Sequence, residues 1–174
     1  LGINVLRNDG RSALAVALAA EAQFIRVNVL CGARVTDQGI IQGIAYGLLR
    51  EREALSARHI KILADVHVKH SAALGEPRPL GEEVEELLSR GGADAVVVTG
   101  GGTGQEANLA DLKKAKAAAG DAPVFVGSGI SAETITTYAD HVDGFIVGTA
   151  LKHGGKSTAP VDPKRVRALL AALP

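Results

Sequence analysis

Three polar residues alternate along one predicted strand and could carry acid–base chemistry. Asp65, His67 and Lys69 are two positions apart, so in an extended strand their side chains share one face. A carboxylate beside an imidazole sets its tautomer and favours its charged form, and a nearby ammonium binds an anion or acts as an electrophile. His67 is therefore the candidate general acid or base, assisted by Asp65 and Lys69. The alternative is a structural charge cluster inside the fold.

Asp65 and His67 could also supply two ligands to a metal ion. At least one further ligand would have to come from elsewhere in the chain. We therefore assign no metal site, and the sequence names no other cofactor.

Two glycine-rich turns near the end of the chain could hold a phosphate group. Gly127, Ser128 and Gly129 follow one predicted strand and lead into a helix, and Gly148 and Thr149 follow the next strand. Such turns bring backbone N–H groups and a helix N-terminus close to an anion with no side chain in the way. The alternative is that these glycines only turn the chain tightly. Because two such turns follow consecutive strands, we favour phosphate binding.

Amide, guanidinium and hydroxyl side chains complete a candidate substrate-binding set. Alternation along two strands lets amides from neighbouring strands converge on the hydroxyl or carbonyl groups of a substrate. It is equally consistent with Asn4 and Asn28 pairing with each other inside the fold. The loop 99–107 matches a GxGxxA fingerprint, but no acidic residue ends the following strand, so we expect a loop over the site. The set is Asn4, Asn8, Arg26, Asn28, Thr99 and Thr103.

Predicted strands and predicted helices, which must position these residues, alternate along the chain. Strands are predicted over 3–6, 24–30, 60–68, 93–98, 124–126 and 144–147. Helices are predicted over 12–22, 37–55, 81–89, 109–119, 132–139 and 163–173. Thr36, Asn108 and Ser131 stand where helix N-caps belong, and Gly91 and Gly120 where helices should end. The acidic run 82–86 is expected to be a solvated helix face.

Strands joined by helices pair in parallel, which indicates the α/β class as an open doubly wound sheet or a barrel. Ile25, Val27 and Val29 share one strand face, and Arg26 and Asn28 share the other. A barrel interior holds polar residues toward its mouth, whereas an open sheet covered on both faces should be apolar throughout. We therefore predict an incomplete TIM (β/α)8 barrel in a single domain over 1–174. Six βα units are present, and the first two are expected to precede Leu1 in a longer protein.

The composition limits the kinds of partner and cellular compartment that we expect for this chain. Nineteen basic and nineteen acidic residues cancel, and aromatic residues make up only 3% of the chain, so we expect no nucleic-acid partner. No apolar stretch approaches the roughly 20 residues that span a bilayer. A single cysteine, Cys31, excludes an internal disulfide, which fits the cytoplasm. We expect its thiol to be packed rather than nucleophilic, because no adjacent base is visible.

Several segments together carry a family resemblance. INVLRND (3–9), FIRVNVL (24–30) with VTDQG (35–39), ADVHVKH (64–70), GSGIS and GTALK follow one another as in the BtpA family, which this chain resembles over nearly its whole length. The family takes its name from a factor needed to accumulate photosystem I. The resemblance implies a barrel similar at its C-terminal end to ribulose-phosphate-binding barrels. It assigns no catalytic residue.

Three functions follow from these expectations. The first is an enzyme that binds a small phosphorylated metabolite, a sugar or nucleoside phosphate, and performs isomerase-like or lyase-like proton transfer. The second is a non-catalytic biogenesis factor for photosystem I, with peripheral membrane association left open. The third is an inactive barrel that senses a ligand. A homo-oligomer is also left open, because the strands holding Asn4 and Ile146 would have unpaired outer edges.

Overall fold

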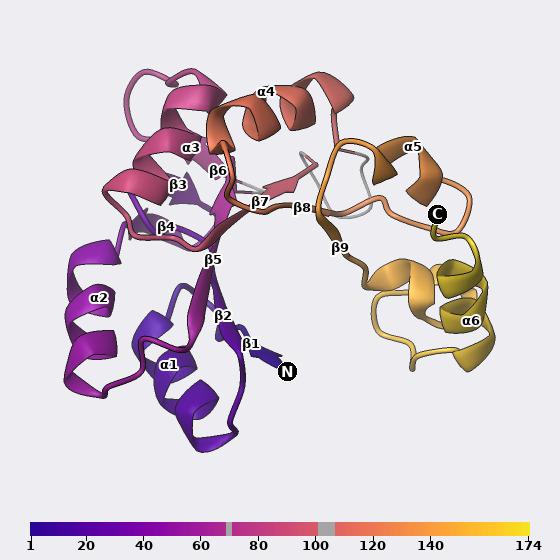
Figure 1. The fold of residues 1–174 in the computed structure, drawn as a ribbon, viewed down its shortest axis with the longest axis horizontal. Helices are drawn as coiled ribbons and strands as arrows, with labels where there is room; N and C mark the ends of the chain where they lie inside the picture. Colours follow the sequence, from indigo (N-terminus) through magenta and orange to yellow (C-terminus); the bar gives the residue numbers. More distant parts are fainter. Residues whose placement is uncertain (69–70, 101–106) are drawn as a thin grey trace.

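The computed structural model describes residues 1–68, 71–100 and 107–174. Its main sheet has six strands in the order β1-β2-β5-β7-β8-β9, and every neighbouring pair is parallel. The sheet curls into a half-barrel with the helices along its outer side (Figure 1). The strands are β1 (Gly2–Ile3), β2 (Phe24–Val27), β5 (Lys61–Val66), β7 (Ala95–Thr99), β8 (Val124–Gly127) and β9 (Gly144–Ile146).

Helices follow the strands in the predicted alternation. They are α1 (Gly10–Ala19), α2 (Ala45–Ala54), α3 (Leu80–Ser89), α4 (Leu109–Ala119), α5 (Ile135–Ala139) and α6 (Pro163–Ala171). Two short 3-10 turns, η1 (Thr149–Leu151) and η2 (His153–Gly155), separate β9 from α6. Six βα units of an incomplete TIM barrel are therefore confirmed, and the doubly wound sheet was the wrong alternative.

The two faces of the sheet carry different side chains because successive residues of a strand point to opposite sides. The outer face buries β-branched residues such as Ile25, Ile62 and Val96 under the helices, and each is fully buried. Full burial of one such side chain stabilises the fold by about 1.5–3 kcal/mol. The inner face carries a smaller cluster that forms an open apolar trough of about 670 Å³. That cluster consists of Leu63, Ala95 and Val97, with Phe24, Phe125 and Ile146 packed against it.

Carboxylates fasten the base of the sheet, the end where the strands begin. Asp94 precedes β7 and accepts a hydrogen bond from the backbone N–H of Ile62 at 2.9 Å. Asp143 precedes β9 and accepts from the N–H of Val124 at 2.7 Å. Each carboxylate also pairs with cationic side chains, Asp94 with Arg52 and Lys61. In two βα units, an aspartate before one strand thus binds a backbone N–H of the neighbouring strand and sets their register.

A second, small sheet corrects the prediction of a single helix over 37–55. β3 (Ala33–Thr36), β4 (Gly39–Gln42) and β6 (Ser71–Ala73) form an antiparallel sheet in the order β4-β3-β6. Asp37 and Gln38 form the two-residue hairpin turn, and Gly39 has φ +97°, which favours glycine. Helix α2 begins only at Ala45. The loop after β2 and the loop after β5 are therefore joined into one layer.

The predicted helix caps have mixed outcomes. Asn108 caps α4 by accepting from the Ala110 N–H at 2.8 Å, and Gly120 ends that helix with φ +58°. Thr36 as an N-cap was wrong: it ends β3, and its hydroxyl accepts from the Gln38 N–H within the hairpin turn. After α3, the residue with a positive φ is Gly92 rather than Gly91.

Candidate functional site

The candidate site lies at the mouth of the half-barrel, where the strands of the main sheet end. Two hollows lie there. The first, which we call the glycine cavity, has a volume of about 410 Å³ and is lined by both glycine-rich turns and by Arg26. The second, which we call the charged cavity, has a volume of about 260 Å³ and lies between β2, β5, the small sheet and α3. In TIM-barrel enzymes the active site gathers at this end.

The backbone of the glycine cavity can approach a ligand closely. Gly129 and Ser128 both have positive φ, +69° and +80°, so the chain turns sharply after β8. A Cβ atom added at Gly148 would meet no other atom within 4 Å, since this residue borders open space. The N–H groups of Gly129 and Gly148 have no backbone acceptor among the described residues. The five predicted residues Gly127, Ser128, Gly129, Gly148 and Thr149 all line this one cavity.

The helix expected behind the first turn starts later than predicted. The prediction was 132–139, but α5 begins at Ile135 and has only five residues. The Ser131 N–H donates to Thr134 Oγ1 at 3.0 Å, and that hydroxyl donates to the Gly129 carbonyl at 3.1 Å. These bonds fix the turn itself. Any anion site here is therefore built from the turns, without a contribution from a full helix N-terminus.

Two buried hydroxyls at the mouth have unused hydrogen-bonding capacity. Thr99 Oγ1 and Ser128 Oγ are shielded from solvent and have no hydrogen-bond partner within the described ranges. Leaving a buried hydroxyl unsatisfied costs about 1–3 kcal/mol, so such groups are uncommon without a purpose. Ser128 lines the glycine cavity, and Thr99 is paired in register with Gly127 of the same cavity. Thr103, the other predicted threonine, lies outside the described residues.

Asp65 is bound by two residues of β2 and the segment that follows it. The Arg26 guanidinium donates from Nε to Oδ1 at 2.7 Å and from Nη2 to Oδ2 at 3.0 Å. Asn28 donates to Oδ2 at 2.8 Å. The Asp65 side chain is only 3% exposed, so this is a largely buried ion pair. Charge-assisted, bidentate pairing of this kind fixes the guanidinium plane.

The asparagines fasten the backbone at the mouth. Asn4 donates to the Arg26 carbonyl at 2.8 Å, and Asn28 donates to Asp65, so the alternative in which these two amides pair with each other was wrong. Asn8 donates to the Val29 carbonyl at 2.8 Å and accepts from the Val29 N–H at 2.7 Å. This reciprocal pair ties the loop after β1 to the segment just beyond β2.

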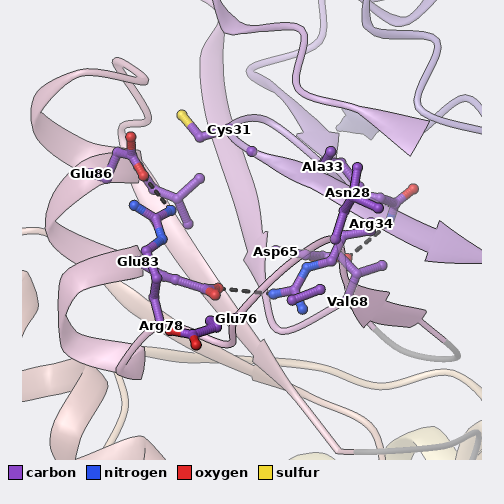
Figure 2. A pocket seen from close by; sticks show the side chains of 15 residues that line it. Asn28, Cys31, Ala33, Arg34, Asp65, Val68, Glu76, Arg78, Glu83 and Glu86 are labelled. Atoms are coloured by element: carbon purple, nitrogen blue, oxygen red, sulfur yellow. Dashed lines mark hydrogen bonds and ion pairs between the residues drawn. The ribbon is translucent and has the colours of Figure 1, made fainter. Parts of the chain in front are cut away.

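Ion-paired side chains line the charged cavity. Figure 2 shows Glu83 and Glu86 projecting from α3 toward Arg34 and Arg78. Glu83 Oε2 lies 2.9 Å from Arg34 Nη2, and Arg78 is paired with Glu86 and lies on the loop before α3. The Glu83 side chain is 14% exposed, so the expectation of a solvated acidic face was wrong at this position. The hairpin that supplies Arg34 covers this part of the helix.

His67 follows the end of β5 with a positive φ of +51°. Its Nε2 lies 3.7 Å from Glu83 Oε2, and its side chain is 41% exposed. Asp65 is bound by Arg26 and Asn28, and within the described ranges His67 is paired with the carboxylate of Glu83, which the sequence did not single out. Lys69 lies outside the described residues.

Cys31 lines both the charged cavity and the hollow beside α2. Burial raises the pKa of this thiol, and the Glu86 carboxylate raises it further. A raised pKa lowers the thiolate fraction at neutral pH, which agrees with a packed thiol. Within the described ranges, no three carboxylate, imidazole or thiol groups come together as a metal site. In the same ranges, no helix is both long and apolar enough to cross a bilayer.

The half-barrel with a ligand-sized mouth defines a protein of the TIM-barrel type. This chain belongs to the BtpA family, whose model matches residues 1–173. It is 47% identical over 173 residues to the photosystem I biogenesis protein BtpA of Synechocystis sp., covering 99% of this chain and 60% of the relative. It is 46% identical over 165 residues to an uncharacterized protein of Pyrococcus abyssi, covering 95% of this chain and 62% of the relative.

Solved structures confirm the fold type. Phosphoribosyl anthranilate isomerase from Thermus thermophilus aligns with a TM-score of 0.58 at 16% identity, covering 98% of this chain and 69% of the isomerase. KGPDC from Streptococcus mutans aligns with a TM-score of 0.60 at 14% identity, covering 94% of this chain and 66% of that protein. At these identities the likeness concerns the fold. The chain spans 60–62% of the two relatives' lengths.

Proposed function

We propose that the protein binds a small phosphorylated metabolite, a sugar or nucleoside phosphate, at the mouth of the half-barrel. The observation that carries this proposal is the glycine cavity, in which two glycine-rich turns, including Ser128, and Arg26 surround about 410 Å³. Backbone N–H groups, a hydroxyl and a guanidinium are the donors that phosphate oxygens accept from. We further propose that the protein acts in the cytoplasm.

The rest of the ligand is proposed to extend toward Asn28 and the charged cavity. Asn28 and Asp65 line that cavity, while Arg26, their neighbour, lines the glycine cavity. The Asn28 amide suits the hydroxyls of a sugar. His67 stands at the same mouth with its side chain partly exposed, so it can reach solvent and exchange protons, and it is the proposed general acid or base.

The first experiment follows backbone amide signals by NMR during titration with ribose 5-phosphate and, separately, with ribose. We expect saturable shifts of Gly129 and Gly148 with the phosphate ester only. In the Gly148→Leu variant the added side chain occupies the cavity, and affinity for ribose 5-phosphate should fall at least tenfold.

Gly47→Leu is the matched control for that variant. Gly47 lies in α2, and an added Cβ atom there also meets nothing within 4 Å, but the residue does not line the glycine cavity. Its affinity should stay within twofold of the original chain. Equal shifts with ribose and ribose 5-phosphate, or equal losses in the two variants, would contradict the proposal.

A second candidate is a non-catalytic assembly role, suggested by the biogenesis role in the name of the Synechocystis relative, which is 47% identical to this chain. The small sheet and the residue after it support this role by exposing apolar side chains: Val35 is 41%, Ile40 58% and Leu74 56% exposed. In a Synechocystis strain whose BtpA segment is replaced by this chain, an assembly role predicts loss of photosystem I with Ile40→Asp and normal accumulation with Gly148→Leu. The metabolite-binding role predicts the reverse.

A further inference from the structure

Arg26 stands between the two cavities of the mouth and uses only part of its hydrogen-bonding capacity. A guanidinium has five N–H donors in a fixed planar fork. Two of them bind Asp65, which leaves three without a protein acceptor among the described residues. The side chain is 22% exposed and lines the glycine cavity. Arg26 is therefore the cation from which that cavity can offer charge to a ligand.

The same guanidinium is already neutralised by Asp65. Both oxygens of the Asp65 carboxylate accept hydrogen bonds, Oδ1 from Arg26 and Oδ2 from Arg26 and Asn28. The Asp65 side chain is almost completely buried. Water screens a buried pair poorly, so the negative charge of Asp65 reduces the positive potential that an anion meets in the glycine cavity. An anion that binds there has to share Arg26 with this carboxylate.

We propose that Asp65 is a positioning residue that sets the strength and charge selectivity of the anion site through Arg26. It holds one edge of the guanidinium, so that the other edge faces the ligand in a fixed orientation. It also offsets part of the positive charge, which weakens the binding of a dianion more than that of a monoanion, because the interaction energy scales with the charge of the ligand. The three remaining N–H donors of Arg26 still favour the more highly charged ligand, so the ligand class is a phosphomonoester rather than a phosphodiester or a carboxylate. This inference rests on the proposed function and specifies how its anion site discriminates.

The charge balance gives Asp65→Asn an unusual expected effect. Asparagine keeps an oxygen that can accept from Arg26 but removes the competing charge. If Asp65 were a general base or a direct ligand contact, the substitution should weaken binding or leave it unchanged. If it were only structural, affinity should fall together with stability. Under our proposal, affinity for a phosphomonoester should instead rise three- to tenfold.

The test titrates the 174-residue chain with methyl phosphate and with dimethyl phosphate at pH 7.5, following the Gly129 and Gly148 amide signals by NMR. In the original chain, methyl phosphate should bind at least tenfold more tightly. In Asp65→Asn, affinity for methyl phosphate should rise more than affinity for dimethyl phosphate, so the ratio between the two affinities should widen. Asp121→Asn is the matched control, because it removes an exposed carboxylate that precedes β8, at the far end of that strand, and it should change affinity less than 1.5-fold.

The outcomes of this titration separate the proposed function from the inference about Asp65. If the original chain and Asp65→Asn both fail to bind either ester, the proposed function and this inference fall together. If methyl phosphate binds but Asp65→Asn does not strengthen binding, only the inference is overturned. If Asp65→Asn fails to fold, two other measurements test the inference. The first is the ratio of the affinities of the original chain for methyl phosphate and dimethyl phosphate. The second is the affinity of Arg26→Lys for methyl phosphate, which should fall tenfold because lysine keeps the charge but not the planar fork.

Discussion

Aspartates at the two ends of the sheet do different work. At the base, Asp94 and Asp143 bind backbone N–H groups of the neighbouring strands, Ile62 and Val124. At the mouth, the partners of Asp65 among the described residues are side chains, those of Arg26 and Asn28. A carboxylate on backbone N–H groups holds strands in register, whereas a carboxylate on side chains adjusts the charge and orientation of groups that face a cavity. The carboxylates at the base therefore hold neighbouring strands together, whereas the carboxylate at the mouth orients side chains that border the two cavities.

The largest expected effect tests the base. Asp94→Ala removes the acceptor of the Ile62 N–H and the partner of Arg52 and Lys61. Because a buried donor is left unsatisfied, the free energy of unfolding should fall by about 2 kcal/mol. Urea denaturation measures this, with the exposed Asp121→Ala as a control expected to stay within about 0.5 kcal/mol. The affinity of Asp94→Ala for ribose 5-phosphate should stay within twofold of that of the original chain. A larger loss would show that the base also affects the proposed binding site at the mouth.

A smaller effect tests the mouth. Ser128→Ala removes a hydroxyl that has no partner within the described part of the chain. The free energy of unfolding should therefore stay the same or rise slightly, since an unsatisfied buried group is lost. Affinity for ribose 5-phosphate should fall about fivefold, or about 1 kcal/mol, in line with the net contribution of a single hydrogen bond. A fall in stability with unchanged affinity would mean that the hydroxyl belongs to the fold.

The smallest effect is a pH dependence at the base. Partial burial acts to raise the pKa of the Asp143 carboxyl, but hydrogen bonds from Lys116 and the Val124 N–H lower it more, so the pKa lies below its ordinary value. A lowered pKa in the folded state stabilises the protein at neutral pH, and this stabilisation is lost as the pH falls below about 4. Solvent screens this 40% exposed pair, so the contribution should be less than about 1 kcal/mol.

Urea denaturation of the original chain and Asp143→Asn at pH 7 and pH 3 measures that contribution. The stability difference between the two chains should be present at pH 7 and smaller at pH 3. Asp140→Asn, an exposed neighbour, provides the comparison and should show no such change. A difference that grows in acid would have the wrong sign for a lowered pKa.

Much of the main sheet could be predicted from the sequence because its signals are local. β-Branched runs alternate with helical segments, and the parity of Ile25 against Arg26 separates the helix-covered face from the inner face. The glycine-rich turns could also be predicted, since glycine after a strand is a local signal. Their meeting in one cavity follows from the order of the last two parallel strands.

The small sheet could not be predicted in the same way. Ile40, Ile44 and Leu48 are four residues apart, which matches a helix as well as it matches a hairpin followed by a helix. β3 pairs with residues 71–73, far along the chain, and that pairing outweighs local propensity. The role of Glu83 was missed for the same reason, because its partner Arg34 comes from the hairpin. Similarly, sequence spacing placed Asp65 beside His67, whereas its partners lie on the neighbouring strand and just beyond it.

The shared small sheet has a consequence for redesigning this molecule. Loops at the mouth of a barrel are usually treated as interchangeable modules that can be grafted one at a time. Here β3 and β4 come from one loop and β6 from another, and all three pair in a single layer. Inserting or deleting residues in either loop would shift the register of both. A redesign of the mouth would therefore have to exchange the two loops as a matched pair.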